Sequence, residues 1–302
     1  MLSIRNVVKQ YSSHRALDNV SIEIEKGRIF GLLGPNGAGK TSLIRIINQI
    51  IEPDEGEVLL NGERLNPSHI PIIGYLPEER GLYRKMEIGE QLLYLAQLKG
   101  VSRKEAATRV KYWFEKLEMQ GWWKKKVSDL SKGMQQKVQF IAAVIHQPQL
   151  IILDEPFSGF DPVNAETIKK EILRLNEEGA TIIFSTHRME TVEELCDSIA
   201  LIHKARLILN GKVKDIRNSY HNNTYRIRYT GDDPAFSFTG DIFSVTDHTF
   251  SEGAGEVTLR VNEGFTSNDM LGCLIPNVQI HQVIEVVPTI HDIFIEKVKK
   301  IN

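Results

Sequence analysis

The sequence contains few cysteines and no long apolar run, and both absences limit what the chain can be. Its two cysteines, Cys196 and Cys273, fit no metal-binding spacing and indicate buried thiols in a reducing compartment. No run of about 18 apolar residues occurs, which argues against a membrane-spanning helix. Residues 1–6 lack the apolar segment of a secretory signal, so we expect none. Any action at a membrane would require a partner.

A large excess of charge of either sign is also absent. The 302 residues carry 37 lysines and arginines and 39 aspartates and glutamates, a formal net charge of −2. This balance gives no general attraction to nucleic acid or to an anionic membrane, and we expect no nucleic-acid partner. The basic run 124–126 follows Trp122 and Trp123. It is most simply a solvated face, with a partner contact as the alternative.

A phosphate-binding loop is the most informative feature of this chain. The pattern G-x-x-x-x-G-K-[ST] is matched by the run Gly34-Pro35-Asn36-Gly37-Ala38-Gly39-Lys40-Thr41, which Ser42 follows. Its glycines allow successive backbone N–H groups to face an anion. Lys40 supplies charge for the β- and γ-phosphates, and the Thr41 hydroxyl is a ligand for Mg²⁺. An apolar strand before the loop and a helix after it support this interpretation over a simple turn.

The chain alternates between strand and helix patterns up to about residue 215. Apolar strands at 150–153, 181–184 and 198–202 are separated by helical segments, which predicts an α/β fold with a mainly parallel sheet. Asn61-Gly62 predicts a hairpin turn. Between this turn and the strand 150–153, residues 87–147 are predicted to be helical. A capping box at Ser102 and Glu105 and a third helix after Ser131 support this prediction.

A second domain follows a predicted linker at 218–223. Period-two strands at 225–229, 256–261 and 279–284, with helices near 267–274 and 290–299, predict a small α+β domain over 219–302. No chemistry is recognisable in this domain.

Two carboxylates follow the apolar strand 150–153. Asp154 and Glu155 lie where ligands bind in an open α/β sheet, at the carboxyl end of a strand. Asp154 is suited to hold Mg²⁺, and Glu155 to polarise a water that attacks the γ-phosphate. A solvated Asp-Glu pair is the alternative.

The order of these motifs resembles that of the ATP-binding subunits of ABC transporters over residues 1–215. The resemblance implies an ABC cassette with a parallel core sheet, an antiparallel β subdomain and a helical subdomain. Leu130-Ser131-Lys132-Gly133-Met134 is similar to the family signature LSGGQ, which closes on nucleotide bound by the opposite subunit. Ser158, Gly159 and Asp161 resemble the D-loop that links the two sites. His187, at the end of a buried strand, matches the switch histidine, and Tyr11 matches the aromatic that stacks on adenine.

Each of these assignments has a plainer alternative, and three positions depart from the family pattern. Ser131 suits an ordinary helix cap, His187 a structural role and Tyr11 packing. Glu78 replaces the usual glutamine, where it could still bind Mg²⁺ and a water. Lys132 replaces a glycine and Met134 a glutamine. These variants, with the C-terminal extension around 286–294, resemble the branch that contains sodium-extrusion and drug-resistance ATPases.

The resemblance therefore implies an ATPase that uses ATP and Mg²⁺ and acts as a head-to-tail dimer. Its implied partners are a second ATP-binding subunit and a membrane-spanning permease, which would place it at the cytoplasmic face of the cell membrane. Export is the expected direction of transport. The alternatives are a soluble ABC ATPase with a non-transport partner and a regulatory subunit that binds ATP without hydrolysis.

Overall fold

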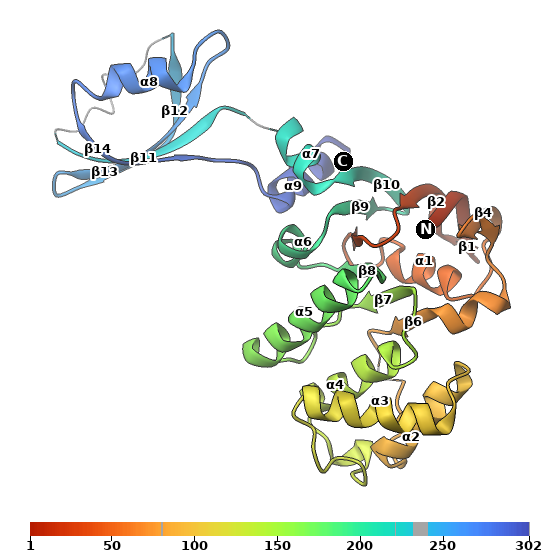
Figure 1. Ribbon diagram of the computed structural model, residues 1–302. Helices are drawn as coiled ribbons and strands as arrows, with labels where there is room; N and C mark the ends of the chain where they lie inside the picture. Colours follow the sequence, from red (N-terminus) through yellow and green to blue (C-terminus); the bar gives the residue numbers. More distant parts are fainter. Residues whose placement is uncertain (80, 221, 232–240, 302) are drawn as a thin grey trace. The chain divides into compact units, whose positions relative to one another are not determined.

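A computed structural model describes residues 1–79, 81–220, 222–231 and 241–301 (Figure 1). The chain forms two compact units, Met1–Val213 and Lys214–Asn302. Each has its own cluster of buried apolar side chains, so each is described by itself.

The first unit begins with an antiparallel sheet. It contains β1 (Leu2–Tyr11), β2 (His14–Ile24), β4 (Glu55–Leu60) and β5 (Glu63–Arg64), in the order β2-β1-β4-β5. The predicted hairpin is confirmed, since β4 and β5 pair across Asn61 and Gly62. Both turn residues have positive φ, 54° and 86°, as a two-residue hairpin turn requires.

The central sheet has six strands, and all but one run parallel. It contains β3 (Ile29–Leu33), β6 (Ile73–Leu76), β7 (Leu150–Asp154), β8 (Thr181–Thr186), β9 (Ser198–His203) and β10 (Arg206–Lys212), in the order β10-β9-β3-β8-β7-β6. Only β10 is antiparallel to its neighbour. Every residue of β3, β7 and β8 is buried, which explains the apolar runs at the centre of these strands. The predicted α/β fold is thus confirmed, and the carboxyl ends of β3, β7 and β8 meet at one edge.

Three helices of this unit follow the strands that end at that edge. They are α1 (Lys40–Ile47), α5 (Pro162–Glu177) and α6 (Met189–Leu195). The apolar side chains of α1 belong to one buried cluster with residues of both sheets. Packing below β3 is tight as well, because a Cβ on Gly31 would lie 3.1 Å from the Sγ atom of Cys196. Cys196 itself is a free, buried thiol.

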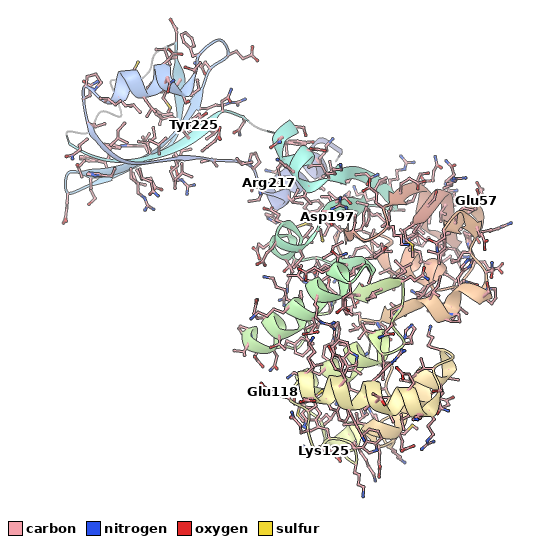
Figure 2. All side chains as sticks on the ribbon, in the orientation of Figure 1. Glu57, Glu118, Lys125, Asp197, Arg217 and Tyr225 are labelled. Carbon is pink, nitrogen blue, oxygen red and sulfur yellow. The ribbon has the colours of Figure 1, made fainter. Side chains whose placement is uncertain are left out.

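A helical subdomain contains α2 (Ile88–Leu98), α3 (Arg103–Lys116), the 3₁₀ turn Val127–Asp129 and α4 (Lys132–Val144). Trp113 of α3 packs edge-on against Phe140 of α4, with ring centroids 5.8 Å apart. Gly89 has to be a glycine, because a Cβ there would lie 2.4 Å from the Trp123 ring. Lys125 lies in this subdomain with its Nζ 5.2 Å from the Trp122 ring centroid (Figure 2).

The predicted capping box of α3 forms only in part. Ser102 Oγ accepts a hydrogen bond from the backbone N–H of Glu105 at 3.3 Å. The Glu105 carboxylate does not return to Ser102 but accepts from Arg109 Nε at 2.8 Å, one helical turn further on. The ion pair therefore takes the place of the reciprocal bond.

The second unit contains a four-stranded antiparallel sheet in the order β12-β13-β11-β14. Its strands are β11 (Thr224–Thr230), β12 (Phe243–Ser251), β13 (Ala254–Val261) and β14 (Gln279–Glu285). Helix α8 (Ser267–Leu274) lies across this sheet in Figure 1, and its Met270 and Leu274 belong to the buried cluster. Cys273, a free and partly buried thiol, is also on α8. Helix α9 (Ile290–Ile301) ends the described chain.

The linker prediction is wrong for its first residues. Asn218 and Ser219 end helix α7 (Val213–Ser219), where Ser219 Oγ donates to the Ile216 carbonyl at 2.7 Å. His221, in the same predicted linker, lies outside the described residues. Strands β10 and β12 were not predicted. The reason for β10 is its turn-forming pair Asn210-Gly211, and the reason for β12 is that its alternation of apolar and polar residues is weak. Their pairing with β9 and β13 determines the strands instead.

None of the helices in the described part of the chain combines the length and apolar character that crossing a lipid bilayer requires.

Candidate nucleotide-binding and hydrolysis site

The phosphate loop connects β3 to α1 and depends on its glycines. Gly34, Gly37 and Gly39 have φ of 147°, 77° and 118°, which side-chain-bearing residues rarely adopt. A Cβ on Gly34 would lie 2.2 Å from the Ile202 carbonyl oxygen, and one on Gly39 would lie 2.3 Å from that of Ala16. Helix α1 has neither a side-chain cap nor an acidic residue in its first turn. Its N-terminal N–H groups therefore suit an anion.

Lys40, the first residue of α1, is almost completely buried. Its Nζ donates to the carbonyl oxygens of Gly34 at 2.7 Å and Pro35 at 3.1 Å. Burial lowers the pKa of Lys40, and the carboxylates of Glu155, Asp154 and Glu78 act in the opposite direction. The site thus brings one buried cation close to three carboxylates, which come from two segments far apart in sequence.

Asp154 ends β7 with a polar atom that the fold leaves without a partner. Its Oδ2 is buried and accepts no hydrogen bond within the described residues, and the same holds for the hydroxyl of Ser185. Ser185 is its register neighbour on β8. Burial raises the pKa of Asp154, the adjacent Ser185 hydroxyl acts in the opposite direction, and the negative charges of Glu78 and Glu155 raise the pKa further. A buried carboxylate oxygen of this kind fits a cation or its bound water.

The described residues contain no cluster of three or more histidine, cysteine, aspartate or glutamate side chains that would hold a metal ion alone. Mg²⁺ in phosphate-binding sites is usually held by one or two carboxylates together with phosphate oxygens. The donor set Thr41, Glu78 and Asp154 is compatible with that arrangement.

Glu155 is held firmly from the end of β8. Its Oε1 accepts from the backbone N–H of His187 at 2.9 Å and lies 2.7 Å from His187 Nδ1, and its Oε2 accepts from Thr186 Oγ1 at 3.1 Å. The backbone N–H of Glu155 donates to the Ser185 carbonyl at 2.9 Å. Its φ of 48° is unusual for a residue other than glycine. The structure thus brings Glu155 and His187 into direct contact.

A hollow of about 260 Å³ is lined by ten of the predicted site residues. Its lining combines the phosphate loop, the carboxylates and the β1–β2 turn: Tyr11, His14, Ala16, Asn36, Gly37, Gly39, Lys40, Thr41, Ser42, Glu78, Asp154 and Glu155. His14 and Ala16 were not predicted. Their only signal in the sequence is closeness to Tyr11, because the turn between β1 and β2 decides which side chains face the hollow.

Tyr11, the last residue of β1, lies next to a lysine of the same strand. Lys9 Nζ lies 5.7 Å from the Tyr11 ring centroid. Lys9 is in turn fixed by the Asp54 carboxylate at 2.9 Å and the Glu52 carbonyl at 2.8 Å. Tyr11 as a residue is 38% exposed, which leaves it accessible for stacking.

The signature and D-loop residues do not line this hollow. Ser131 caps α4, where its Oγ accepts from the Met134 N–H at 3.3 Å. Lys132 is exposed, and Gly133 packs close to the Gly159 carbonyl. Asp161 caps α5 by accepting from the N–H groups of Val163 and Asn164. The two motifs are therefore neighbours of each other within one chain, and the backbone N–H of Ser158 donates to the Glu155 carbonyl at 3.0 Å.

Comparison with known proteins places this geometry in a family. The family model "ABC transporter" matches residues 17–158, and the model of the C-terminal domain of DrrA1-3-like ATP-binding proteins matches residues 211–298. The chain is 41% identical over 300 residues to the ABC transporter ATP-binding protein YhaQ of Bacillus subtilis, covering 99% of this chain and 98% of YhaQ.

Two further relatives from Bacillus subtilis match a smaller part of the chain. NatA, an ABC transporter ATP-binding protein, is 37% identical over 209 residues, covering 68% of this chain and 85% of NatA. The linearmycin resistance ATP-binding protein LnrL is 34% identical over 219 residues, covering 72% of this chain and 70% of LnrL.

Solved structures show the same fold. The structure of an ATP-binding subunit of an ABC transporter superposes with a TM-score of 0.69 at 31% identity, covering 73% of this chain and 93% of that one. The dimeric cassette MJ0796 bound to ADP and phosphate gives a TM-score of 0.65 at 25% identity, covering 70% of this chain and 98% of that one. The predicted resemblance is confirmed: the chain belongs to the ATP-binding proteins of ABC transporters, in the branch with a DrrA-like C-terminal domain.

Proposed function

We propose that this chain hydrolyses ATP with Mg²⁺ and thereby drives a membrane-spanning partner. One observation carries the catalytic part of this proposal. The Glu155 carboxylate is held by Thr186 and His187 on the edge of the hollow that also contains Lys40 and Asp154. A carboxylate fixed beside a phosphate loop is suited to accept a proton from an attacking water.

Different residues of the hollow bind different parts of ATP. Tyr11 stacks on the adenine, and the glycine-rich loop with the N-terminus of α1 surrounds the phosphates. Lys40 exchanges its bonds to the Gly34 and Pro35 carbonyls for phosphate oxygens. Thr41, Glu78 and Asp154 would hold Mg²⁺, which supplies positive charge to the β- and γ-phosphates when bound.

Hydrolysis then depends on the residues at the end of β8. Glu155 orients a water and takes its proton, while Thr186 keeps the carboxylate in place. His187, in contact with Glu155, responds to the γ-phosphate and stabilises the charge that develops there. In this proposal, the contact between His187 and Glu155 is the part of the site that responds to the γ-phosphate.

The signature requires a second copy of the chain. Ser131, Lys132, Gly133 and Met134 lie outside the hollow, so we infer that they act on nucleotide bound by the opposite subunit. Similarity to a cassette described as dimeric supports a head-to-tail pair. Ser158, Gly159 and Asp161 would link the two sites.

The membrane-spanning partner is inferred from the family. We propose that the chain binds it at the cytoplasmic face of the membrane, through the segment between Glu78 and Glu90, which begins at the hollow and leads to α2. Similarity to LnrL, a resistance protein, supports export as the direction.

The first test compares the purified chain with its Glu155→Gln variant. We expect kcat for phosphate release to fall by about a hundredfold, with the Kd for ATP within about twofold, because the amide keeps the shape but accepts no proton. Light scattering in ATP and Mg²⁺ should show a trapped dimer of the variant. Glu79→Gln is the matched control, since that carboxylate does not line the hollow, and it should retain kcat within about twofold.

Two outcomes would count against the proposal. Hydrolysis by Glu155→Gln near the original rate would remove Glu155 from the catalytic role. A complete lack of hydrolysis by the unmodified chain, both alone and with its membrane partner, would favour a regulatory subunit that only binds ATP.

A further inference from the structure

Gln136 is a buried polar residue on the helix that carries the signature. It lies on α4, one turn after Ser131, and is only 3% exposed. Its Nε2 donates to the carbonyl oxygen of Pro156 at 3.2 Å. Pro156 directly follows Glu155. A buried amide is costly without a hydrogen bond, so this contact fixes the distance between α4 and the residue next to the catalytic carboxylate.

The same helix touches the segment after Glu155 at a second point. A Cβ added to Gly133 would lie 3.3 Å from the Gly159 carbonyl oxygen and 3.5 Å from the Phe160 ring. The first turn of α4 therefore packs directly against the D-loop at Gly159 and Phe160.

A neighbouring glutamine extends the contact to the other side of the hollow. Gln139 is 4% exposed, and its Nε2 lies 3.4 Å from the carbonyl oxygen of Glu79. Glu79 follows Glu78, which lines the hollow. One face of α4 thus meets both loops that carry carboxylates to the site.

Glu155 itself is fixed from the other direction by β8. Its carboxylate is held by Thr186 and His187, and its backbone N–H by Ser185. From α4, the Gln136–Pro156 hydrogen bond reaches the residue that directly follows Glu155. Glu155 is therefore held directly from β8, and the residue that follows it, Pro156, is held from α4.

We propose that Gln136 is a positioning residue: it sets the Glu155 carboxylate through Pro156 and makes that position depend on α4. This inference rests on the proposed function, in which the N-terminus of α4 meets nucleotide bound by the opposite subunit. Binding of nucleotide at one site then orders the catalytic carboxylate of the other site, so that the two sites hydrolyse ATP together. A displacement of a catalytic group by about 1 Å is sufficient to slow the chemical step strongly.

The test replaces Gln136 by methionine, which keeps the length of the side chain and removes the donor. We expect kcat to fall about tenfold while the Kd for ATP stays within about twofold, because the phosphate loop is untouched. Combined with Glu155→Gln, the substitution should leave the ATP-trapped dimer intact. It should also slow hydrolysis no further, since both changes act on one group.

Lys137→Met is the matched control on the same turn of α4. It also removes one bond from a side chain to a carbonyl, but that bond goes to Leu117 in the helical subdomain at 3.2 Å. We expect this variant to keep kcat within about twofold. An equal loss of kcat in both variants would mean that α4 only needs to be stable, and would overturn the proposal.

Three further results would overturn it as well. These are a kcat of Gln136→Met within twofold of the unmodified chain, loss of the trapped dimer in the double variant, and a Kd that rises together with the fall in kcat. If the unmodified chain does not hydrolyse ATP either alone or with its membrane partner, the proposed function has failed, and hydrogen exchange then decides the positioning role. The Ser158 N–H, which donates to the Glu155 carbonyl at 3.0 Å, should exchange at least about fivefold faster in Gln136→Met than in Lys137→Met. Equal exchange would reject it.

Discussion

His146 is the residue whose titration should be most visible in the stability of the chain. Burial, with the positive charge of Lys99 as the next cause, lowers its pKa to about 4, and its Nε2 lies 3.1 Å from the Ile73 carbonyl oxygen. An unfolded chain binds this proton below pH 6.5, but the folded one stays neutral down to about pH 4. Protons therefore favour unfolding across this window, and we expect a loss of about 3 kcal/mol from this side chain as the pH falls through it.

The His146→Gln variant tests this expectation. Its amide retains a donor for the Ile73 carbonyl but does not titrate, so the variant should lose less stability on acidification. Urea unfolding at neutral pH and near pH 4.5 provides the measurement. An equal decrease in the free energy of unfolding for both proteins would contradict the assignment.

At the level of residues, the sequence predicts which groups form the site better than it predicts how they are held. Lys40, Asp154 and Glu155 can be predicted because their neighbours in sequence form a loop or a buried strand. Thr186 could not be predicted as a partner of Glu155, because that contact requires the register between β7 and β8. Gln136 presents the same difficulty, since its partner is twenty residues away and in another element.

At the level of elements, a carboxylate joins the helical subdomain to α5. Glu171 of α5 is 8% exposed, and its Oε2 lies 3.1 Å from Lys116 Nζ of α3 and 2.8 Å from Arg174 Nε. The Arg174 guanidinium also lies 5.6 Å from the Trp113 ring centroid. We expect Glu171→Ala to lower the free energy of unfolding by about 2 kcal/mol, because it takes the carboxylate away from Lys116 and removes the more buried of the two carboxylates that pair with Arg174.

The glutamate that caps the C-terminus of the same helix provides the control. Glu178 also pairs with Arg174, but its side chain is 57% exposed. Glu178→Ala should therefore cost about 0.5 kcal/mol or less in urea unfolding. Similar losses in the two variants would show that the bridge between α3 and α5 adds no special stability.

Elements with strong patterns were the ones that sequence could predict. The strand 150–153 is apolar at every position, and α8 follows a capping box at Thr266 and Asp269. By contrast, β10 forms only because β9 offers it an antiparallel edge, and its own Asn-Gly pair is typical of a turn. Helix α7 was missed for a related reason, since asparagine and serine at its end are frequent in loops.

At the level of the whole molecule, two separate cores predict two unfolding transitions. Leu259 is 0% exposed in the core of the second unit, and Leu43 is 1% exposed in the core of the first. Replacing either by alanine should cost about 3 kcal/mol in its own unit. In calorimetry, ATP with Mg²⁺ should raise only the transition that Leu43→Ala lowers, and Leu259→Ala should lower the other. A single transition that moves equally in both variants would contradict this expectation.

The two cysteines described with the fold have a practical consequence. Cys196 is buried beneath Gly31, and burial raises the pKa of its thiol, so it offers little thiolate to a reagent. Cys273, on α8 of the second unit, is only partly buried. The natural chain therefore provides a single favoured attachment point for a spin label or fluorophore. The C-terminal domain, whose chemistry is unassigned, can be observed during ATP turnover without any engineered cysteine.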